Sequence, residues 1–383
     1  MKITAFNENA PGKAIKTLDG YYTYIPNPLP PQLQWSNKLL SALSSAERSI
    51  ARLEEVGCAF SVPHIVVRPF IRKEAVFSSQ IEGTRTTFEE LLTYETRQLS
   101  LFGDAEDRQE VHNYVHALDY GIGRLQNLPV SLRLIREIHG VLMQDVRGGS
   151  MTPGKLRKSQ NWIGRPGATL EKARYVPPPV DEMHRCLSEL EIFIHQDSDL
   201  PPLIKIGLIH YQFEAIHPFL DGNGRIGRLL ITLLLIVWQL MSQPLLYLSL
   251  FIESNRTEYY DRLLAVTQKG DWEAWLLFFL DGVHEQAEDA IKRIQALQTL
   301  RLEYQGLFSK ERSKKNLAAM VDYFISTPIS SIAQAQEVVN LGGFATIQRY
   351  IDKLESLGIV QEITGKARNR IYRANKILRV LEE

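Results

Sequence analysis

The chain has 383 residues, 44% of them hydrophobic, with 44 Lys and Arg against 44 Asp and Glu. This composition excludes a disordered or collagen-like chain, and the length suggests two or three domains. Zero net charge excludes a protein that is basic throughout, although a local basic segment remains compatible with it.

The sequence carries no sign of export or of membrane insertion. Its two cysteines, Cys58 and Cys186, form no CxxC motif, which argues against structural zinc and favours a cytoplasmic location. The first residues lack the apolar stretch of a secretory signal. Residues 229–252 are uncharged over 24 positions, but a polar cluster and Pro244 interrupt them near the centre. We therefore expect a buried helix followed by a second apolar segment, and no membrane partner.

Most of the chain has helical periodicity. Residues 1–34 are the exception at the start, because the X-Pro pairs of YIPNPLPP (24–31) predict an extended lead-in. A second exception, 149–180, is rich in Gly and Pro and predicts a long loop or short hairpin, a kind of segment that often carries function. Apolar spacing predicts helices at 39–57, 67–102, 106–126, 132–144, 183–195, 203–216, 225–241, 259–268 and 272–302.

The C-terminal part changes character. Helices are predicted at 317–326, 332–339 and within 342–359, and two β-like runs follow within 360–374. Three short helices and a hairpin are the pattern of a winged helix-turn-helix. Its recognition side would be 345–350, with Thr346, Gln348 and Arg349. Residues 363–381 contain no acid and six basic residues, namely Lys366, Arg368, Arg370, Arg373, Lys376 and Arg379. Such a wing indicates DNA contact, but winged helices also dock proteins, and both partners stay open.

The most informative stretch is IHPFLDGNGRIGR at 216–228. It predicts a tight Gly-rich loop opening into an apolar helix, whose free N–H groups and partial positive charge suit a phosphate. Arg225 and Arg228, one turn apart, can contact phosphate oxygens. Asp221 is a hard oxygen ligand suited to Mg²⁺, and His217 is placed as a general base would be. The stretch is not a P-loop, whose G-x-x-x-x-G-K-[ST] pattern the chain lacks.

This stretch resembles the signature of the Fic family, H-P-F-x-[D/E]-G-N-G-R-x-x-R, at every fixed position. The resemblance continues through Asn255-Arg256-x-x-Tyr259-Tyr260, through Gly270-Asp271-Trp272 and through the Pro-rich segments at 24–31 and 175–179. It covers about 20–290. It implies a mostly α fold, with an all-helical Fic core, a short β-hairpin flap and, in such larger members, a C-terminal winged helix-turn-helix domain.

The resemblance implies transfer of AMP from ATP to a Ser, Thr or Tyr hydroxyl of a target protein. His217 would be the catalytic residue that deprotonates this hydroxyl, and Asp221 would hold Mg²⁺. Tyr259 and Tyr260 could contact the adenine or could equally be core aromatics. The implied ATP site comprises Glu82, His217, Gly222, Asn223, Gly224, Arg225, Ile226, Gly227, Arg228, Tyr259 and Tyr260.

Gly224 bears on the subtype. The related Doc-like kinases resemble H-x-F-x-[D/N]-[A/G]-N-K-R, with lysine at the position that Gly224 occupies here. The resemblance implies that lysine there favours phosphate transfer and that glycine favours AMP transfer.

A second motif lies upstream. Residues 78–83, SSQIEG, resemble the family's inhibitory motif [S/T]-x-x-x-E-[G/N] through Ser78, Glu82 and Gly83. Glu82 would pair with Arg228 and take the guanidinium that otherwise binds the γ-phosphate. An ordinary helix C-terminus is the alternative for these residues. Some family members use the inhibitory Glu to remove AMP, so a reverse reaction stays open.

The motifs divide the chain into an N-terminal helical extension with the inhibitory motif (1–105), a Fic catalytic core (106–290), a connecting helix or linker (291–315) and the winged helix-turn-helix domain (316–383).

His112 and His116, four apart on a helix, favour a structural role because no third metal ligand has suitable spacing. Segment 160–178, with Arg174 and Tyr175, could align the target backbone by strand addition. One alternative function stays open, namely a regulator whose Fic core only senses nucleotide. The oligomeric state also stays open, with a homodimer as one candidate.

Overall fold

The computed structural model describes residues 3–59, 64–97, 105–146, 152–164, 167 and 169–382. Its helices are α1 (Asn37–Ala59), α2 (His64–Ile81), α3 (Phe88–Arg97), α4 (Ala105–Arg124), α5 (Leu132–Leu142), α6 (Val180–His195), α7 (Pro202–Ile216), α8 (Asn223–Val237), α9 (Ser249–Ser254), α10 (Arg256–Lys269), α11 (Trp272–Leu307), α12 (Lys314–Ser326), α13 (Ile332–Val339), α14 (Phe344–Ser356) and α15 (Asn375–Glu382). Short 3-10 turns lie at Ile3–Ala5 and Leu170–Lys172. The fold is mostly α, as predicted from the sequence.

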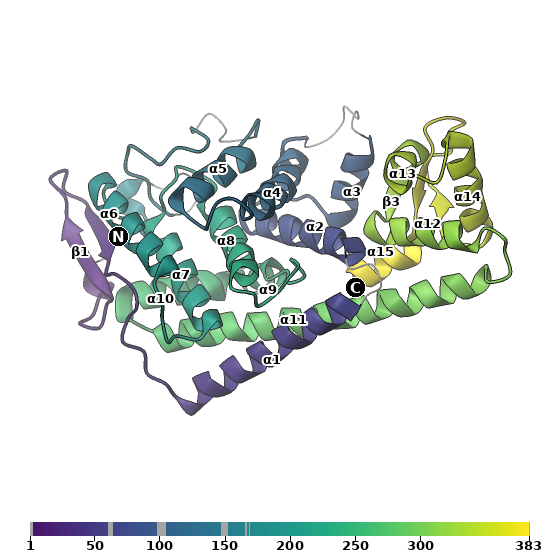
Figure 1. Cartoon of the computed structure of the whole chain (residues 1–383). Coiled ribbons are helices and arrows are strands. Elements are labelled where there is room, and N and C mark those ends of the chain that lie inside the picture. The colour runs from purple at the N-terminus through teal and green to yellow at the C-terminus, as the bar shows by residue number, and fades with distance from the viewer. Residues whose placement is uncertain are drawn as a thin grey trace.

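Helices α1 and α11 form the long base of the molecule (Figure 1). The apolar positions of α1 recur every three or four residues, which places Leu39, Leu43, Ile50 and Leu53 on one face. That face packs against α11, whose 36 residues are buried at intervals from Trp272 to Tyr304. Because α11 runs along both the central helices and the C-terminal part, it joins the two (Figure 1).

Helices α7 and α8 lie at the centre and are buried on nearly all sides. This explains the uncharged stretch at 229–252: α8 ends at Val237, a non-helical segment follows, and α9 begins at Ser249. No helix in the described part of the chain is both long and apolar enough to cross a membrane.

The sequence predicts a single helix at 67–102, but the structure has two helices there, α2 and α3. Helix α2 ends at Ile81, and a turn separates it from α3, with Gly83 at a φ of 107° that suits glycine. Residues 98–102 of that predicted helix lie outside the described residues.

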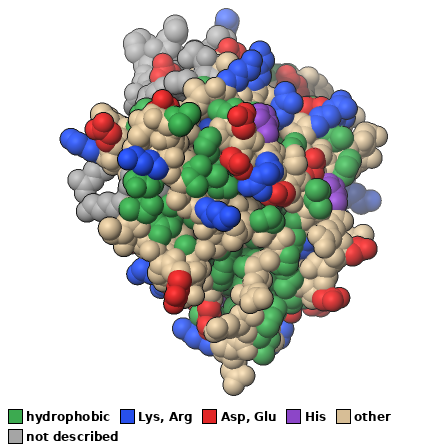
Figure 2. All heavy atoms as spheres, turned by 90° about the vertical axis from the view of Figure 1, so that its left-hand side faces the viewer, with side chains coloured by type: hydrophobic (Ala, Val, Ile, Leu, Met, Phe, Trp, Pro, Cys, Tyr) green, Lys and Arg blue, Asp and Glu red, His purple; other side chains and the backbone are tan. Residues whose placement is uncertain are grey.

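An antiparallel hairpin, β1 (Gly12–Lys16) and β2 (Tyr22–Pro26), forms within the predicted extended lead-in, pairing Gly12 with Pro26 and Lys16 with Tyr22. The Tyr24 N–H donates to the Val176 carbonyl at 2.9 Å, so the hairpin holds the end of the long 149–180 segment. Figure 2 views the molecule from this end, where acidic and basic side chains are interspersed.

The 152–179 segment is largely irregular, as the sequence predicts. The pairing of the predicted flap is a single antiparallel bridge between Ile163 and Tyr175, and residues 165, 166 and 168 lie outside the described part. The Tyr175 hydroxyl donates to the Ala215 carbonyl at 2.6 Å, and Arg174 contacts Asp261. The segment therefore packs against α7 and α10.

The C-terminal part has the order α12, β3 (Ile329–Ser331), α13, α14, β4 (Gln361–Glu362), β5 (Ile371–Arg373) and α15. Its strands form a three-stranded antiparallel sheet in the order β3-β5-β4. This order is compatible with a winged helix. The part packs on α2, α3 and α11, where Thr96 donates to the Ile329 carbonyl at 3.0 Å and Arg373 pairs with Glu89 at 2.7 Å (Figure 1).

Leu53→Ala is expected to lower the free energy of unfolding by about 2–5 kcal/mol, because Leu53 is fully buried between α1 and α11 and truncation leaves a cavity. Leu40→Ala, on the same helix but 46% exposed, should change it by less than about 0.5 kcal/mol. Urea unfolding followed by circular dichroism measures both. Equal losses in the two variants would contradict the proposed packing of α1.

Candidate active site

The candidate site forms where α7 ends and α8 begins. His217 ends α7 in the left-handed conformation, with φ 50° and ψ 62°. Gly222, at φ 78°, then caps the start of α8, and a Cβ there would lie 2.9 Å from the Met143 sulfur. The six residues between the two helices therefore turn tightly enough to bring His217 beside the free N–H groups at the start of α8.

His217 has the protonation state of a general base. Its Nδ1 lies 3.3 Å from the Glu214 carbonyl, so a neutral ring carries its proton on Nδ1 and leaves the Nε2 lone pair free. Burial lowers the pKa of His217 to about 4, and the ring is therefore neutral at pH 7.

The loop backbone is held by Asn223 and His139. The Asn223 amide bonds both polar groups of the Phe219 backbone, at 2.8 and 2.9 Å. The Phe219 ring stacks on His139 with 3.8 Å between centroids. His139 Nε2 lies 3.0 Å from the Asp221 carbonyl, and its Nδ1 accepts from the Gly154 N–H at 2.9 Å. The side chain of Asn223 thus fixes the loop, and its backbone N–H lies at the helix start.

Two side chains of the irregular 152–164 segment support the same loop. Arg157 is 1% exposed and donates to the carbonyls of His217, Ser159 and Pro178, at 3.0, 3.2 and 2.5 Å. Asn161 donates to the carbonyls of His217 and Phe219, at 3.2 and 2.7 Å. Burial lowers the pKa of Arg157 to about 10, which leaves it charged at pH 7. The sequence did not point to Arg157, Asn161 or His139, because their contacts are with backbone atoms far along the chain.

Asp221 is the acidic side chain of the loop. Its Oδ1 accepts the Gly222 N–H at 2.6 Å and lies 3.8 Å from Arg225 Nη2, and the side chain is 48% exposed. A single accessible carboxylate beside a helix start suited to phosphate fits Mg²⁺, which takes one or two carboxylates and completes its shell with phosphates and water. No group of three or more His, Cys, Asp or Glu suited to a metal occurs in the described ranges.

Arg225 lies in the core beside the loop. Its side chain is 3% exposed, Nη1 pairs with Glu110 on α4 at 3.0 Å, and Nη2 contacts the Met143 sulfur at 3.6 Å. Glu110, 115 positions away in the sequence, was not among the expected residues. Its carboxylate compensates the buried charge of Arg225 and ties α8 to α4.

The predicted inhibitory motif and Arg228 meet in space. Arg228 is 2% exposed; its Nε donates to the Ser78 hydroxyl at 2.9 Å, and Nη2 donates to the Ser78 carbonyl at 2.8 Å and to Glu82 Oε1 at 2.7 Å. Burial by itself would raise the pKa of Glu82, but the positive charge of Arg228 outweighs it and holds that pKa below its usual value. Ser78 and Glu82 can both reach Arg228 because they are one helical turn apart.

Gly224 allows Glu82 to approach α8. A Cβ at Gly224 would lie 2.2 Å from Glu82 Oε1 and 2.9 Å from Arg228 Nη1. A side chain at this position is therefore incompatible with the observed position of Glu82. Ile226 and Gly227, the next residues of α8 among the expected ATP contacts, are buried, and Gly227 faces the Glu214 carboxyl group.

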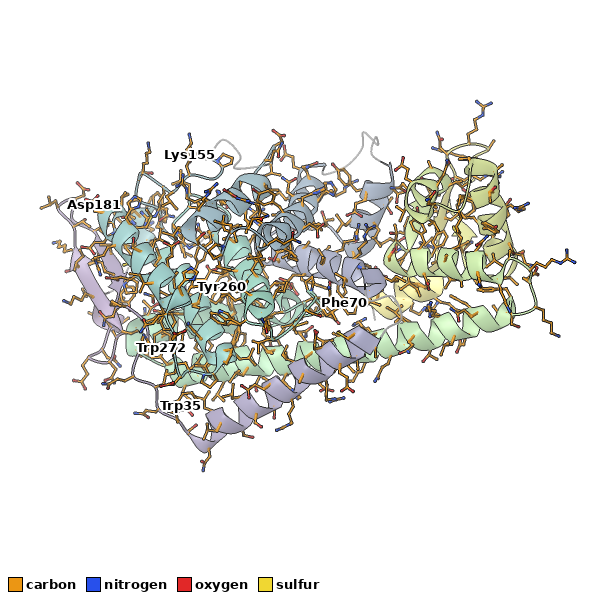
Figure 3. The ribbon with its side chains drawn as sticks, in the orientation of Figure 1. Trp35, Phe70, Lys155, Asp181, Tyr260 and Trp272 are labelled. Atoms are coloured by element: carbon orange, nitrogen blue, oxygen red, sulfur yellow. The ribbon has the colours of Figure 1, made fainter. Side chains whose placement is uncertain are left out.

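The two tyrosines have different surroundings. Tyr259 is 1% exposed, and its hydroxyl bonds His210 Nε2 at 2.8 Å beneath α8. Tyr260 is half-buried, with its ring 5.1 Å from that of Tyr259, and it interacts electrostatically with Glu82 and Arg228. Figure 3 places Tyr260 amid the central helices, away from Trp272 at the start of α11. Tyr259 likewise interacts electrostatically with Arg228 and Glu82, so both tyrosines lie near the contact between these two residues.

His112 and His116 lie apart from this site, on the face of α4 that lines a hollow between α2 and the C-terminal part. Their Nε2 atoms are 2.9 Å apart, and His112 Nδ1 lies 3.8 Å from Glu95, which pairs with Arg72 at 2.7 Å.

A protein-family model matches the part of the chain that carries the loop at 217–228. The model of the Fic/DOC family matches residues 129–235, and that of the Fic/DOC family N-terminal region matches 40–123. Proteins named protein adenylyltransferase Fic from Drosophila grimshawi and Drosophila willistoni are each 26% identical over 249 residues, or 61% of this chain. The chain spans about half the length of these relatives, 47% and 46%.

Solved structures show the same fold. A Fic family protein from Desulfovibrio desulfuricans G20 superposes with a TM-score of 0.59 at 18% identity, covering 90% of this chain and 98% of that one. Fic-1 from C. elegans, residues 134–508, superposes with a TM-score of 0.52 at 20% identity, covering 68% and 74%. The chain therefore contains a Fic/DOC domain preceded by the N-terminal region of that family, and it is homologous to proteins named protein adenylyltransferase Fic.

Proposed function

We propose that this protein is an adenylyltransferase that transfers AMP from ATP to a side-chain hydroxyl of a target protein and is inhibited by its own Glu82. The observation that supports it most is the loop at 217–228, where a neutral histidine base lies beside a helix start suited to phosphate. Homology to the named adenylyltransferases supports ATP as the co-substrate.

In this reaction the target hydroxyl oxygen attacks the α-phosphorus of ATP. The new O–P bond forms as the bond between the α-phosphorus and the bridging oxygen breaks, and pyrophosphate leaves. His217 Nε2 accepts the hydroxyl proton, which its low pKa and its Nδ1 contact with Glu214 allow. The N–H groups at Gly222, Asn223 and Gly224 stabilise phosphate charge. Asp221 would hold Mg²⁺, which supplies charge neutralisation on the phosphates.

Glu82 explains the inhibition. Its carboxylate occupies Arg228, the guanidinium that we assign to the γ-phosphate, so ATP and Glu82 compete for one cation. Ser78 supports this arrangement through two contacts with Arg228, and Glu82 and Gly83 lie in the turn that follows α2. Arg225, in contrast, supports the site by holding α8 against α4.

Removal of AMP is the alternative direction for the same residues, since a carboxylate beside the phosphate site can orient water. Phosphate transfer of the Doc-like kind is disfavoured, because the position that carries lysine in those kinases is Gly224, which lies against Glu82. Segment 160–178 is assigned to alignment of the target backbone.

The proposed domain division is an N-terminal extension at 1–105, a catalytic core at 106–290, a connector at 291–315 and a winged helix-turn-helix domain at 316–383.

DNA binding by the winged helix-turn-helix domain is a second candidate function. A groove of about 800 Å³ runs between α14 and the turn before β5, and Gln348, Lys366, Arg368 and Arg370 line it. Basic side chains at the rim of a groove of this kind suit a phosphate backbone.

The catalytic proposal is tested with ATP labelled on either the α- or the γ-phosphate, incubated with lysate. Glu82→Gly is expected to raise α-label transfer to protein about tenfold or more, because it removes a contact between charged groups of about 1.5–3 kcal/mol. Adding His217→Ala should lower transfer by about 100-fold or more, because the general base is lost. Transfer of γ-label would instead indicate a kinase, and an unchanged rate in Glu82→Gly would contradict the inhibitory role.

The DNA proposal is tested on the full chain by fluorescence anisotropy of a labelled duplex. We expect Lys366→Glu with Arg368→Glu to weaken binding and to reduce the slope of log K against log salt by about 2, one unit for each lost phosphate contact. The matched control is Lys38→Glu with Arg48→Glu on α1, exposed and identical in charge change. Equal affinity in both double variants would assign the wing another role.

A further inference from the structure

Glu214 is a half-buried residue whose carboxyl group has no role in the proposed reaction. It lies on α7, one turn before His217, and its backbone carbonyl accepts the His217 ring contact. Its Oε1 is buried and makes no hydrogen bond with any described residue. A Cβ at Gly227 would lie 2.3 Å from this oxygen, so the carboxyl group is packed directly against α8, at the residue that precedes Arg228 in the sequence. A carboxyl group whose buried oxygen has no hydrogen-bond partner is costly to ionise.

Two carboxyl groups thus flank one guanidinium. Glu82 bonds Arg228 from the end of α2, while Glu214 interacts with it electrostatically from α7. The two carboxyl groups repel each other when both are ionised. Burial raises the pKa of Glu214 to about 8, Arg228 opposes that rise, and Glu82 adds to it.

The other titratable groups around Glu214 cannot replace Arg228 as its partner. His210 bonds the Gly227 carbonyl through Nδ1 at 3.1 Å and Tyr259 through Nε2, and burial lowers its pKa to about 3. Tyr259 and Tyr260 on α10 have raised pKa values because they are buried, so both stay neutral. His217 is neutral as well. Arg228 is therefore the cation that Glu214 faces.

We propose that Glu214 is a second carboxyl partner of Arg228, which keeps its proton while Glu82 is bound to the guanidinium and releases it to pair with Arg228 when Glu82 withdraws. The step moves one proton from the Glu214 carboxyl group to solvent and leaves the net charge around Arg228 unchanged. It makes Glu214 a positioning residue, because its carboxylate would keep the guanidinium in place once the contact with Glu82 is gone.

A buried cation that loses its carboxylate partner strongly destabilises the folded protein. A carboxylate of Glu214 that takes the place of Glu82 beside Arg228 would reduce this loss of stability. In the proposed function, inhibition is released when Glu82 leaves Arg228. The inference adds the loss of one proton from Glu214 to this release, and it therefore rests on the proposed function. Its test does not use AMP transfer, so failure of the catalytic proposal would leave the test valid.

The test is a double-mutant cycle in thermal unfolding on the full chain, with Glu82→Gly, Glu214→Gln and both. In the Glu82-containing protein, the folded-state pKa of Glu214 lies above the usual value near 4.5, so the unfolded chain loses this proton first and stability falls as pH rises between about 5 and 8. Glu214→Gln removes that loss and should raise the unfolding midpoint at pH 8 but not at pH 5.

In the Glu82→Gly background the same substitution should lower the midpoint at pH 8, because Glu214 is then ionised and paired with Arg228. A change of the same sign in both backgrounds would overturn the proposal. Glu137→Gln is the control: Glu137 pairs with Arg124 and Arg133 far from Arg228, and its effect should be equal in both backgrounds.

Infrared spectroscopy gives a second readout that a merely structural role would not change. At pH 7 the wild type should show a protonated-carboxyl band that Glu214→Gln lacks, and the Glu82→Gly protein should show no such difference from its Glu214→Gln derivative. Absence of the band in the wild type, or its persistence without Glu82, would contradict the proposal.

Discussion

A guanidinium buried to 2% exposure needs acceptors for its protons and a compensating negative charge, and the surroundings of Arg228 follow from this need. Ser78 supplies a hydroxyl and a carbonyl, and Glu82 supplies the carboxylate. These acceptors come from the last turn of α2 and from the residue after Ile81, although Arg228 is on α8. The contact between these helices therefore depends on one cation, and any ligand that competes for this cation also competes with α2.

The loop before α8 is held by a different kind of contact. Arg157 and Asn161 donate to its carbonyls, His139 faces the Asp221 carbonyl, and Asn223 bonds the Phe219 backbone. These are hydrogen bonds to backbone groups, which fix the loop without using its side chains. His217 and Asp221 are consequently positioned by residues that leave their reactive atoms free.

Much of this organisation follows from sequence patterns, and the exceptions have a physical reason. Helical periodicity predicted α1 and α11, since their apolar positions recur at the helical period, and the loop at 216–228 was evident from its glycines. The β1–β2 hairpin was missed because its residues pair with each other without strong alternation and with prolines nearby.

The site residues divide in the same way. Glu82 was predicted to pair with Arg228, because its resemblance to a known motif is a local signal, and Ser78 was predicted only as a member of that motif. Glu110, Arg157 and His139 could not be predicted, since each acts through a contact with a residue 60 to 115 positions away. Glu214, three residues before His217, was close to the motif, but only the structure reveals that its buried Oε1 atom lacks a hydrogen-bond partner.

The competition for Arg228 is tested most directly by comparing the dissociation constants of ATP and ADP by calorimetry, in the wild type and in Glu82→Gly. If Glu82 and the γ-phosphate compete for the guanidinium, the wild type should bind the two nucleotides about equally, and Glu82→Gly should bind ATP about tenfold or more tightly than ADP. The same ratio of ATP to ADP affinity in both proteins would contradict the account.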